Sequence, residues 1–153
     1  MIPAMLADSA ITLHHAPFDE VPARALYGQL RVRSAAFVVE QECIYLDLDG
    51  KDLEPGCVMW WHERAGEVLS TIRVLAEGED RVIGRVATDQ SARNLGLAGA
   101  LIRGAIEAEP DRVFHLGGQS HLAGWYGSFG FARSGPNYME DGIPHVPMTR
   151  PAG

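Results

Sequence analysis

The sequence predicts an α+β fold, with a mixed, mainly antiparallel sheet that has helices on both faces. The first observation is a run of three β-rich segments joined by short turns, which implies antiparallel neighbours. The second is that one segment with helical periodicity precedes these strands and another follows them. The third is a buried-looking strand after the second helix, which should lie parallel to the strand before that helix. In order, these segments span residues 21–38, 57–63, 67–75, 81–88, 95–109 and 113–117.

The N-terminal part should contain a loose leader over residues 1–10 and a short strand over 11–14. Asp19 is a good N-cap for the helix 21–38, and Pro22 fits the first turn of that helix. The order of elements excludes a doubly wound nucleotide-binding fold, which would alternate strands and helices throughout.

An acidic segment, residues 40–52, resembles a calcium-binding loop at first sight. Such a loop needs glycine at its sixth position and a bidentate Glu at its twelfth. Counted from Asp47, Gly50 is the fourth residue and Val58 the twelfth. The sequence therefore predicts a solvated turn without calcium.

The helix 95–109 contains Gly99 and Gly104, each of which costs about 1 kcal/mol relative to alanine in a helix interior. This cost suggests that the helix lies very close to the sheet. A short amphipathic helix is expected over 121–129, and one or two strands over 131–150.

Composition restricts the class of protein. With 153 residues, 46% hydrophobic and 22% charged, the chain is expected to be one domain over residues 1–153. The net charge of −7 argues against a nucleic-acid partner, which usually requires a basic face.

No 18-residue apolar run and no secretion signal are present, so we expect no membrane span and a cytoplasmic location. Cys43 and Cys57 form no zinc-binding spacing, and we expect two reduced thiols and no metal.

The turn between the strand 81–88 and the helix 95–109 has the sequence Arg93-Asn94-Leu95-Gly96-Leu97-Ala98. Unpaired N–H groups and the positive end of the helix dipole would meet there, which suits a pyrophosphate. A plain strand–turn–helix explains these six residues equally well. A P-loop is excluded because no Gly-Lys-Ser/Thr follows.

Two motifs resemble the GNAT superfamily of acyl-CoA-dependent N-acyltransferases. Arg93-x-x-Gly96-x-Ala98 matches its central Gln/Arg-x-x-Gly-x-Gly/Ala motif, and residues 125–131, WYGSFGF, match its aromatic Gly-Phe motif. A narrower resemblance, to the ElaA-like branch, covers nearly the whole of residues 11–150. It is carried by FVVEQ at 37–41, DLDGKD at 47–52, IGRV at 83–86, GQSHL at 118–122 and EDGIPH at 140–145.

The resemblance implies the GNAT fold, in which the central parallel strands splay apart and hold acetyl-CoA between them. The main chain of Val86, Ala87 and Thr88 would pair with the pantetheine amides. The N–H groups of the turn would bind the pyrophosphate, with a charge from Arg93, and Gln119 would bind the pantetheine or the acceptor. For Arg93, a solvated surface arginine is nearly as good an interpretation. The predicted pyrophosphate-binding N–H groups are those of Asn94, Leu95, Gly96, Leu97 and Ala98.

Tyr126 stands where the superfamily has a tyrosine that reaches the sulfur, so the resemblance implies that it protonates the leaving thiolate. A phenol with an ordinary pKa of about 10 is neutral at pH 7 and suits this task. The alternative is a core aromatic, which Trp125 or Phe129 fits better.

The base has two candidates. Glu40 follows the first helix and could bind the ammonium or remove its proton, although pairing with Arg33 explains it equally well. His145 could do the same work, because an imidazole titrates near neutrality. A lone histidine on a C-terminal strand is more often structural, and we interpret His121 in that way.

The leading hypothesis is transfer of an acetyl group from acetyl-CoA to a primary amine, on a small molecule or a peptide, by direct attack in a ternary complex. No cysteine accompanies Tyr126, so a covalent acyl-enzyme has little support. The alternatives are a non-catalytic acyl-CoA sensor, an acyl-homoserine-lactone-synthase-like enzyme, which the short chain disfavours, and a protein without a ligand. A homodimer through an exposed tryptophan is possible, although a core role for Trp60, Trp61 and Trp125 is the simpler expectation.

Overall fold

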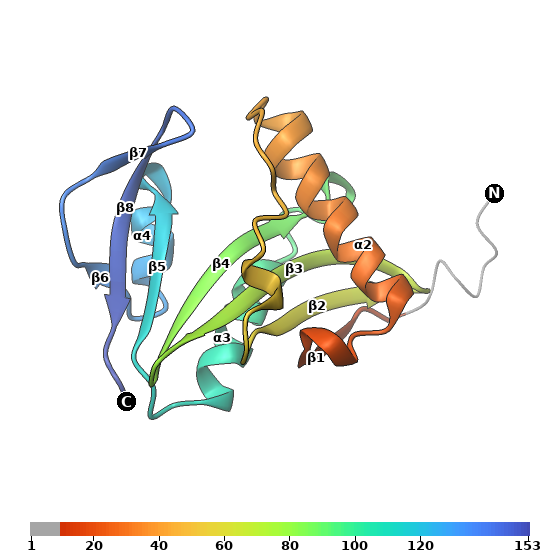
Figure 1. The fold of residues 1–153 in the computed structure, drawn as a ribbon, viewed down its shortest axis with the longest axis horizontal. Helices are drawn as coiled ribbons and strands as arrows, with labels where there is room; N and C mark the ends of the chain where they lie inside the picture. Colours follow the sequence, from red (N-terminus) through yellow and green to blue (C-terminus); the bar gives the residue numbers. More distant parts are fainter. Residues whose placement is uncertain (1–9) are drawn as a thin grey trace.

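The computed structural model describes residues 10–153, in which eight strands form one sheet (Figure 1). The spatial order is β1-β2-β3-β4-β5-β8-β6, and β7 pairs with β8. Each pair is antiparallel except β4 with β5, so the predicted fold class is confirmed. The predicted leader lies outside the described residues, apart from Ala10. The strands are β1 Thr12–Pro17, β2 Val58–Arg64, β3 Glu67–Glu77, β4 Asp80–Thr88, β5 Phe114–Gln119, β6 Ala132–Arg133, β7 Tyr138–Glu140 and β8 Ile143–Arg150.

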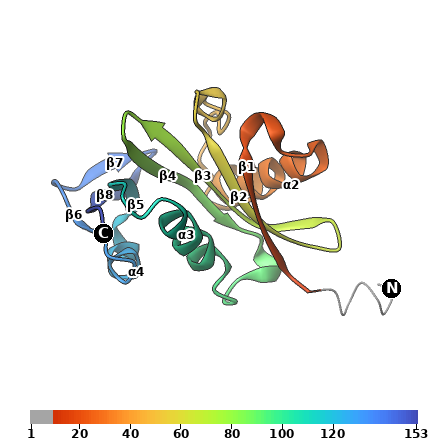
Figure 2. The same ribbon diagram turned by 90° about the horizontal axis from the view of Figure 1, so that it is seen from below.

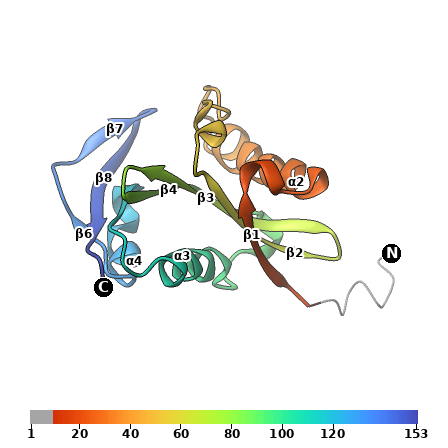
Figure 3. The ribbon, with the colours of Figure 1, turned by 60° about the horizontal axis from the view of Figure 1, so that its bottom comes forward.

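Helices cover both faces of the sheet, as Figures 2 and 3 show. On one face lies α2, Ala23–Arg33, which continues as a π-helix over Ser34–Glu40. On the other face lie α3, Leu97–Ala108, and α4, Ala123–Gly127. Single 3-10 turns occur at Phe18–Glu20, Lys51–Leu53, Gln90–Ala92 and Ser120–Leu122. Within the described part of the chain, no helix is both long and apolar enough to cross a bilayer.

Two main cores, beside a small third cluster, follow from this layering, because successive strand residues point to opposite faces. The core under α2 includes Val32, Met59 and Val68. The core under α3 and α4 includes Ile72, Leu101, Phe114, Leu116, Tyr126, Val146 and Met148. A strand residue can therefore be placed on the α2 face or on the α3/α4 face from its alternation with these core residues.

The parallel strands β4 and β5 are paired only at their beginnings. Their register covers three residue pairs, from Arg81 with Phe114 to Ile83 with Leu116. Beyond these pairs, the strands separate (Figure 1), and no further β4–β5 pair occurs within residues 10–153. We call this separation the splay.

A β-bulge in β4 accompanies the splay. Thr71 of β3 pairs with Ala87 and Arg73 pairs with Gly84, so β4 carries one extra residue between these pairs. Arg85 lies in this stretch with a φ of 51°, in the left-handed region that non-glycine residues rarely adopt. A bulge bends its strand and redirects its side chains.

The helix boundaries differ from the predictions in three places. Asp19 lies in a 3-10 turn, and the residue at the N-cap of α2 is Pro22, whose φ of −56° and ψ of 142° are not helical. The predicted helix 21–38 is α-helical only to Arg33, where the hydrogen bonding changes to the π type. The predicted helix 121–129 consists of a 3-10 turn and the five-residue α4. In the C-terminal part there are three strands rather than one or two, because the three-residue β7 adds a strand to β6 and β8.

The glycines of α3 allow the close packing that the sequence predicted. A Cβ atom on Gly104 would lie 2.8 Å from the Trp60 ring of β2, and one on Gly99 would lie 3.1 Å from Phe129. Gly104 therefore contacts the sheet, whereas Gly99 contacts the segment that follows α4. Trp60 and Trp61 are buried in the two cores, and Trp125 is partly exposed.

The prediction of a solvated turn for the acidic segment is wrong at Asp47 and Asp52, although most of the segment is exposed. Asp47 and Asp52 are buried, with 7% and 5% of their surface exposed, because they bind the fully buried Arg33 of α2. Arg33 donates to Asp47 Oδ2 at 2.8 Å and to the two carboxylate oxygens of Asp52 at 2.8 and 3.1 Å. Arg73 of β3 donates to both carboxylate oxygens of Asp49 at 2.8 Å. The segment is thus fastened to the sheet through ion pairs.

Candidate functional site

The turn between β4 and α3 directs backbone N–H groups from the start of a helix, the geometry that the pyrophosphate prediction requires. Asp89 begins it, and its carboxylate accepts a hydrogen bond from the backbone N–H of Ser91. Asn94 and Gly96 are both left-handed, with φ values of 66° and 74°. Gly96 is the N-cap of α3, and a left-handed conformation there is cheap only for glycine. The first N–H groups of α3 lack helical acceptors, and they lie at the positive end of a 12-residue helix.

The last residues of β4 form a strand edge that faces the splay. Gly84, Ala87 and Thr88 pair with β3 on one side, and none of the residues from Gly84 to Thr88 pairs with β5 on the other. Val86 packs against the α3/α4 core, and Ala87 belongs to the core under α2. Backbone groups on such an edge can pair with the amides of an extended ligand. The residues predicted for this task, Val86, Ala87 and Thr88, therefore lie on an edge of the right kind.

Tyr126 of α4 lies against β5 at the splay. A Cβ atom on Gly118 would lie 2.5 Å from Cε2 of the Tyr126 ring, so the ring packs directly on the glycine. The side chain is 6% exposed, and burial raises the pKa of Tyr126 to about 12. The phenol is therefore fully protonated at neutral pH, as an acid for a thiolate must be.

Glu40 and Arg93 bind each other through two hydrogen bonds. The Nη1 and Nη2 groups of Arg93 donate to the two carboxylate oxygens of Glu40, both at 2.7 Å. Gln90 Nε2 also donates to Glu40 at 3.0 Å, and Arg93 Nη2 donates to the Thr88 carbonyl at 3.2 Å. The hydrogen bond from Arg93, followed by that from Gln90, lowers the pKa of Glu40. The predicted pairing of Glu40 with Arg33 is wrong, because the Arg33 guanidinium is committed to Asp47 and Asp52.

His145 of β8 has a defined tautomer. Its Nδ1 lies 2.8 Å from the Ile143 carbonyl, which can only accept, so Nδ1 carries the hydrogen. In the neutral ring, Nε2 then has a free lone pair, and it lies 3.5 Å from Oε2 of Glu140. His145 pairs with Gln119 across β5 and β8. Because Val146 lies in the α3/α4 core, His145 is on the opposite face, which is the face of α2.

The predicted site residues thus form three groups. Glu40 and Arg93 lie together at the end of β4, Gln119 and His145 lie together at the end of β5, and Tyr126 lies on the other face of β5. Within residues 10–153, no hydrogen bond joins Glu40 or His145 to Tyr126. The predicted acid and the predicted base His145 therefore flank the splay from opposite faces.

Sequence reasoning missed Arg85, whose side chain fastens the β4 bulge to the acidic segment. Its Nη2 donates to the Asp47 carbonyl at 3.0 Å and to Asp49 Oδ2 at 3.2 Å. Its Nε lies 2.8 Å from Asp47 Oδ1 but off the N–H direction, so this contact is electrostatic rather than a well-aligned hydrogen bond. The guanidinium also lies over the Tyr45 ring, 5.6 Å from its centroid. Contacts with Asp47, Asp49 and Tyr45 thus fix the side chain of Arg85, the left-handed residue of the bulge. Arg85 falls in the IGRV stretch of the resemblance, and this was the one available signal.

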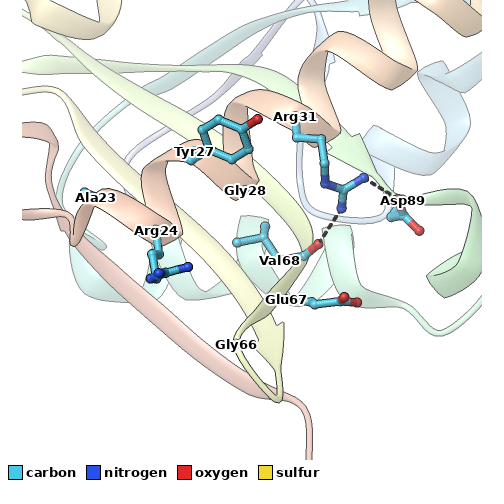
Figure 4. A pocket seen from close by; sticks show the side chains of 9 residues that line it. All are labelled: Ala23, Arg24, Tyr27, Gly28, Arg31, Gly66, Glu67, Val68 and Asp89. Atoms are coloured by element: carbon cyan, nitrogen blue, oxygen red, sulfur yellow. Dashed lines mark hydrogen bonds and ion pairs between the residues drawn. The ribbon is translucent and has the colours of Figure 1, made fainter. Parts of the chain in front are cut away.

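Two pockets lie near these residues. The smaller pocket, of about 470 Å³, lies between the π-helix and the end of β4. Its lining includes Ala36, Val39, Glu40 and Arg93. A larger one, of about 740 Å³, lies between α2 and the β2–β3 hairpin (Figure 4). There Arg31 donates to Asp89 at 3.2 Å and to the Val68 carbonyl at 3.4 Å, away from Tyr126. The smaller pocket adjoins the predicted cofactor turn and is therefore the more relevant of the two.

For the part of the chain that the structure describes, no group of three or more His, Cys, Asp or Glu side chains has the geometry to hold a metal ion. The three aspartates of the acidic segment are bound by arginines instead.

Known proteins with similar sequences agree with the resemblance to the GNAT superfamily. The family model described as an acetyltransferase (GNAT) domain matches residues 27–151. A UPF0039 protein of Mycobacterium tuberculosis is 41% identical over 137 residues, covering 86% of this chain and 88% of that protein. Protein ElaA of Escherichia coli is 37% identical over 147 residues, covering 90% and 93%.

Solved structures agree with the sequence relatives. An acyl-CoA N-acyltransferase from Pseudomonas aeruginosa superposes with a TM-score of 0.87 at 33% identity, covering 92% of this chain and 99% of that one. The crystal structure of Escherichia coli ElaA gives a TM-score of 0.85 at 34% identity, with the same coverage. The splayed sheet and the Arg93-x-x-Gly96-x-Ala98 turn agree with these matches. The chain therefore belongs to the GNAT family of acyl-CoA-dependent N-acyltransferases, in its ElaA-like branch.

Proposed function

We propose that this protein transfers an acetyl group from acetyl-CoA to a primary amine, on a small molecule or a peptide, by direct attack within a ternary complex. The observation that carries the proposal is the splay. The unpaired edge of β4 and the Tyr126 ring on β5 both lie where these two strands have separated. The turn Asn94–Ala98 and Arg93 would bind the pyrophosphate, and Val86, Ala87 and Thr88 would pair with the pantetheine. Gln119 would bind the pantetheine or the acceptor.

The chemistry requires two proton transfers. The amine nitrogen forms a bond to the thioester carbon, the carbon–sulfur bond breaks, and the thiolate takes a proton from Tyr126. His145 removes the proton that the amine nitrogen loses, with Glu140 3.5 Å from its Nε2 to stabilise the imidazolium. Glu40, the other predicted base, is bound on both carboxylate oxygens by Arg93, which favours His145 for this role.

The test is thiol release from acetyl-CoA in the presence of n-butylamine, spermidine, lysine methyl ester and a hexapeptide with a free N-terminus. Tyr126→Phe keeps the ring on Gly118 and removes only the acid, so we expect kcat to fall about 100-fold while acetyl-CoA binding persists. Equal turnover of the variant and the parent would remove Tyr126 as the acid.

The second candidate is a non-catalytic acyl-CoA sensor, in which the buried Tyr126 would serve as a core residue rather than as an acid. Titration calorimetry with acetyl-CoA, alongside the amine panel, separates the two. Binding without turnover of any amine would favour the sensor.

A further inference from the structure

Gly117 and Gly118 of β5 are the first residues beyond the β4–β5 pairing, and they face opposite sides of the sheet. Gly118 points toward Tyr126, within the α3/α4 core. Gly117 alternates with it and therefore points to the α2 face. The two glycines thus leave room on both faces of β5 at the point where the strands part.

On the α2 face, this room is taken by the hydroxyl of a second tyrosine, Tyr138 of β7. A Cβ atom on Gly117 would collide with the Tyr138 hydroxyl oxygen, and it would lie 3.4 Å from Cζ. Tyr138 is 40% exposed, so part of its side chain lies at the surface on this face. The two phenols, Tyr126 and Tyr138, therefore approach adjacent residues of β5 from opposite faces.

Tyr138 is also next to the proposed base. It pairs with His145 across β7 and β8, and the two rings are tilted by 31° with their centroids 5.7 Å apart. Residues paired directly in this way share a face of the sheet. Burial, and then the charge of Glu140, raises the pKa of Tyr138, so the phenol is neutral at pH 7 and its oxygen can accept a hydrogen bond.

The same face is bordered by the segment that follows the π-helix. The Sγ of Cys43 lies 3.9 Å from the carbonyl of Asp141, in the β7–β8 turn. The two segments, which are distant in sequence, thus meet on the side of the sheet where Tyr138 and His145 lie.

We propose that Tyr138 is the acceptor-binding residue of the site. Its oxygen accepts a hydrogen bond from an N–H of the primary amine, which holds the nitrogen lone pair toward the thioester carbon on the face opposite Tyr126. His145, beside Tyr138, receives the proton. The inference rests on the proposed acyl transfer and adds to it the residue that selects and orients the amine.

The first experiment is steady-state kinetics of Tyr138→Phe with the best amine of the panel. Loss of one hydrogen bond in the ground state and the transition state should raise the amine KM about tenfold, with kcat and the acetyl-CoA KM nearly unchanged. An unchanged amine KM would overturn the inference, and so would an equal rise in the acetyl-CoA KM, which would indicate distortion of β5.

Gly117→Ala provides a geometric control. Its methyl group must displace the Tyr138 hydroxyl, so this variant should reproduce the kinetic defect of Tyr138→Phe. In Gly117→Ala/Tyr138→Phe the oxygen is absent and the nearest ring carbon is 3.4 Å away, which is an ordinary contact. The double variant should therefore be no worse than Tyr138→Phe alone. Additive defects would contradict the assignment.

A binding measurement keeps the inference testable if turnover is too slow to resolve. The probe is CoA with an S-linked acetamide of n-butylamine, titrated by calorimetry against CoA itself. Tyr138→Phe should weaken the bisubstrate compound about tenfold and leave CoA unaffected. A parent that binds both compounds, with the variant unchanged, would overturn the inference alone. A parent that binds neither would overturn the proposed function, and the inference with it.

Discussion

Glu40 and Arg93 neutralise each other at the end of β4, where the phosphates of acyl-CoA are proposed to bind. Both carboxylate oxygens of Glu40 accept from the Arg93 guanidinium at 2.7 Å, and Arg93 also holds the Thr88 carbonyl. The Arg93 hydrogen bond lowers the pKa of Glu40, so Glu40 stays ionised at all pH values above the ordinary carboxyl range. Its protonation therefore cannot produce a change in rate between pH 6 and pH 9.

This arrangement predicts the behaviour of Glu40→Gln. The variant should retain kcat to within about threefold and lower the acetyl-CoA KM, because Arg93 is freed for the phosphates. His145→Asn should instead lose about 100-fold in kcat. The measurement is kcat and both KM values from pH 6 to pH 9. A collapse of kcat in Glu40→Gln, with His145→Asn unaffected, would reverse the assignment of the base.

At the scale of elements, α3 and β2 are in unusually close contact. Gly104 faces the Trp60 ring, which is 6% exposed and cannot move aside within the core. This contact sets the distance between α3 and the sheet. It thereby also fixes the position of the helix N-terminus, which begins directly after Gly96.

Gly104→Ala should consequently lower the free energy of unfolding by about 1–3 kcal/mol, even though alanine is the better helix former. The matched control is Gly124→Ala in α4, where a Cβ would meet no atom within 4 Å. That variant should be neutral or more stable by about 0.5–1 kcal/mol. Urea unfolding of both variants checks the pair. Equal stabilisation by both substitutions would show that the Trp60 contact imposes no cost.

At the scale of the whole molecule, the acidic segment connects elements that are far apart in the chain. Arg33 reaches it from α2, Arg73 from β3 and Arg85 from the β4 bulge. Asp52 receives hydrogen bonds from both Arg33 and Arg73, at 2.8 and 3.4 Å. Breaking such a buried pair leaves an uncompensated charge in the interior.

Asp52→Asn should therefore cost about 3 kcal/mol of unfolding free energy at pH 7. Burial alone would raise the pKa of Asp52, but Arg33 and Arg73 outweigh it, so the pKa is lowered. Hydrogen bonds from Arg73 lower the pKa of Asp49 in the same way. A carboxylate with a lowered pKa contributes stability above its unfolded pKa of about 4 and loses it as the pH falls further.

Urea midpoints from pH 7 to pH 3 check this prediction. The parent should lose stability below about pH 4, and Asp52→Asn should lose less over the same range. Asp111→Asn, on an exposed turn, is the matched control and should stay within about 0.5 kcal/mol of the parent. Parallel pH curves for the parent and Asp52→Asn would show that the network does not carry the acid sensitivity.

Sequence reasoning predicted strands β1 to β5, the β4–α3 turn and the short helix that carries Tyr126, because each has a local pattern of period, turn chemistry or motif. It failed at the acidic segment, since three closely spaced aspartates are typical of an exposed turn. Their partners lie 14 to 38 residues away and become visible only in the fold. Tyr138 was missed because β7 has three residues, too few for any periodicity.

The splay has a consequence for solubility as well as for ligand binding. It gives the molecule two unpaired strand borders in the middle of its sheet, and such borders invite β-strand addition by another chain, the first step of aggregation. On β4, the bulge and the charged Arg85 interrupt the flat backbone that a foreign strand would need. The bulge that accompanies the splay should thus also disfavour the addition of a foreign strand to β4.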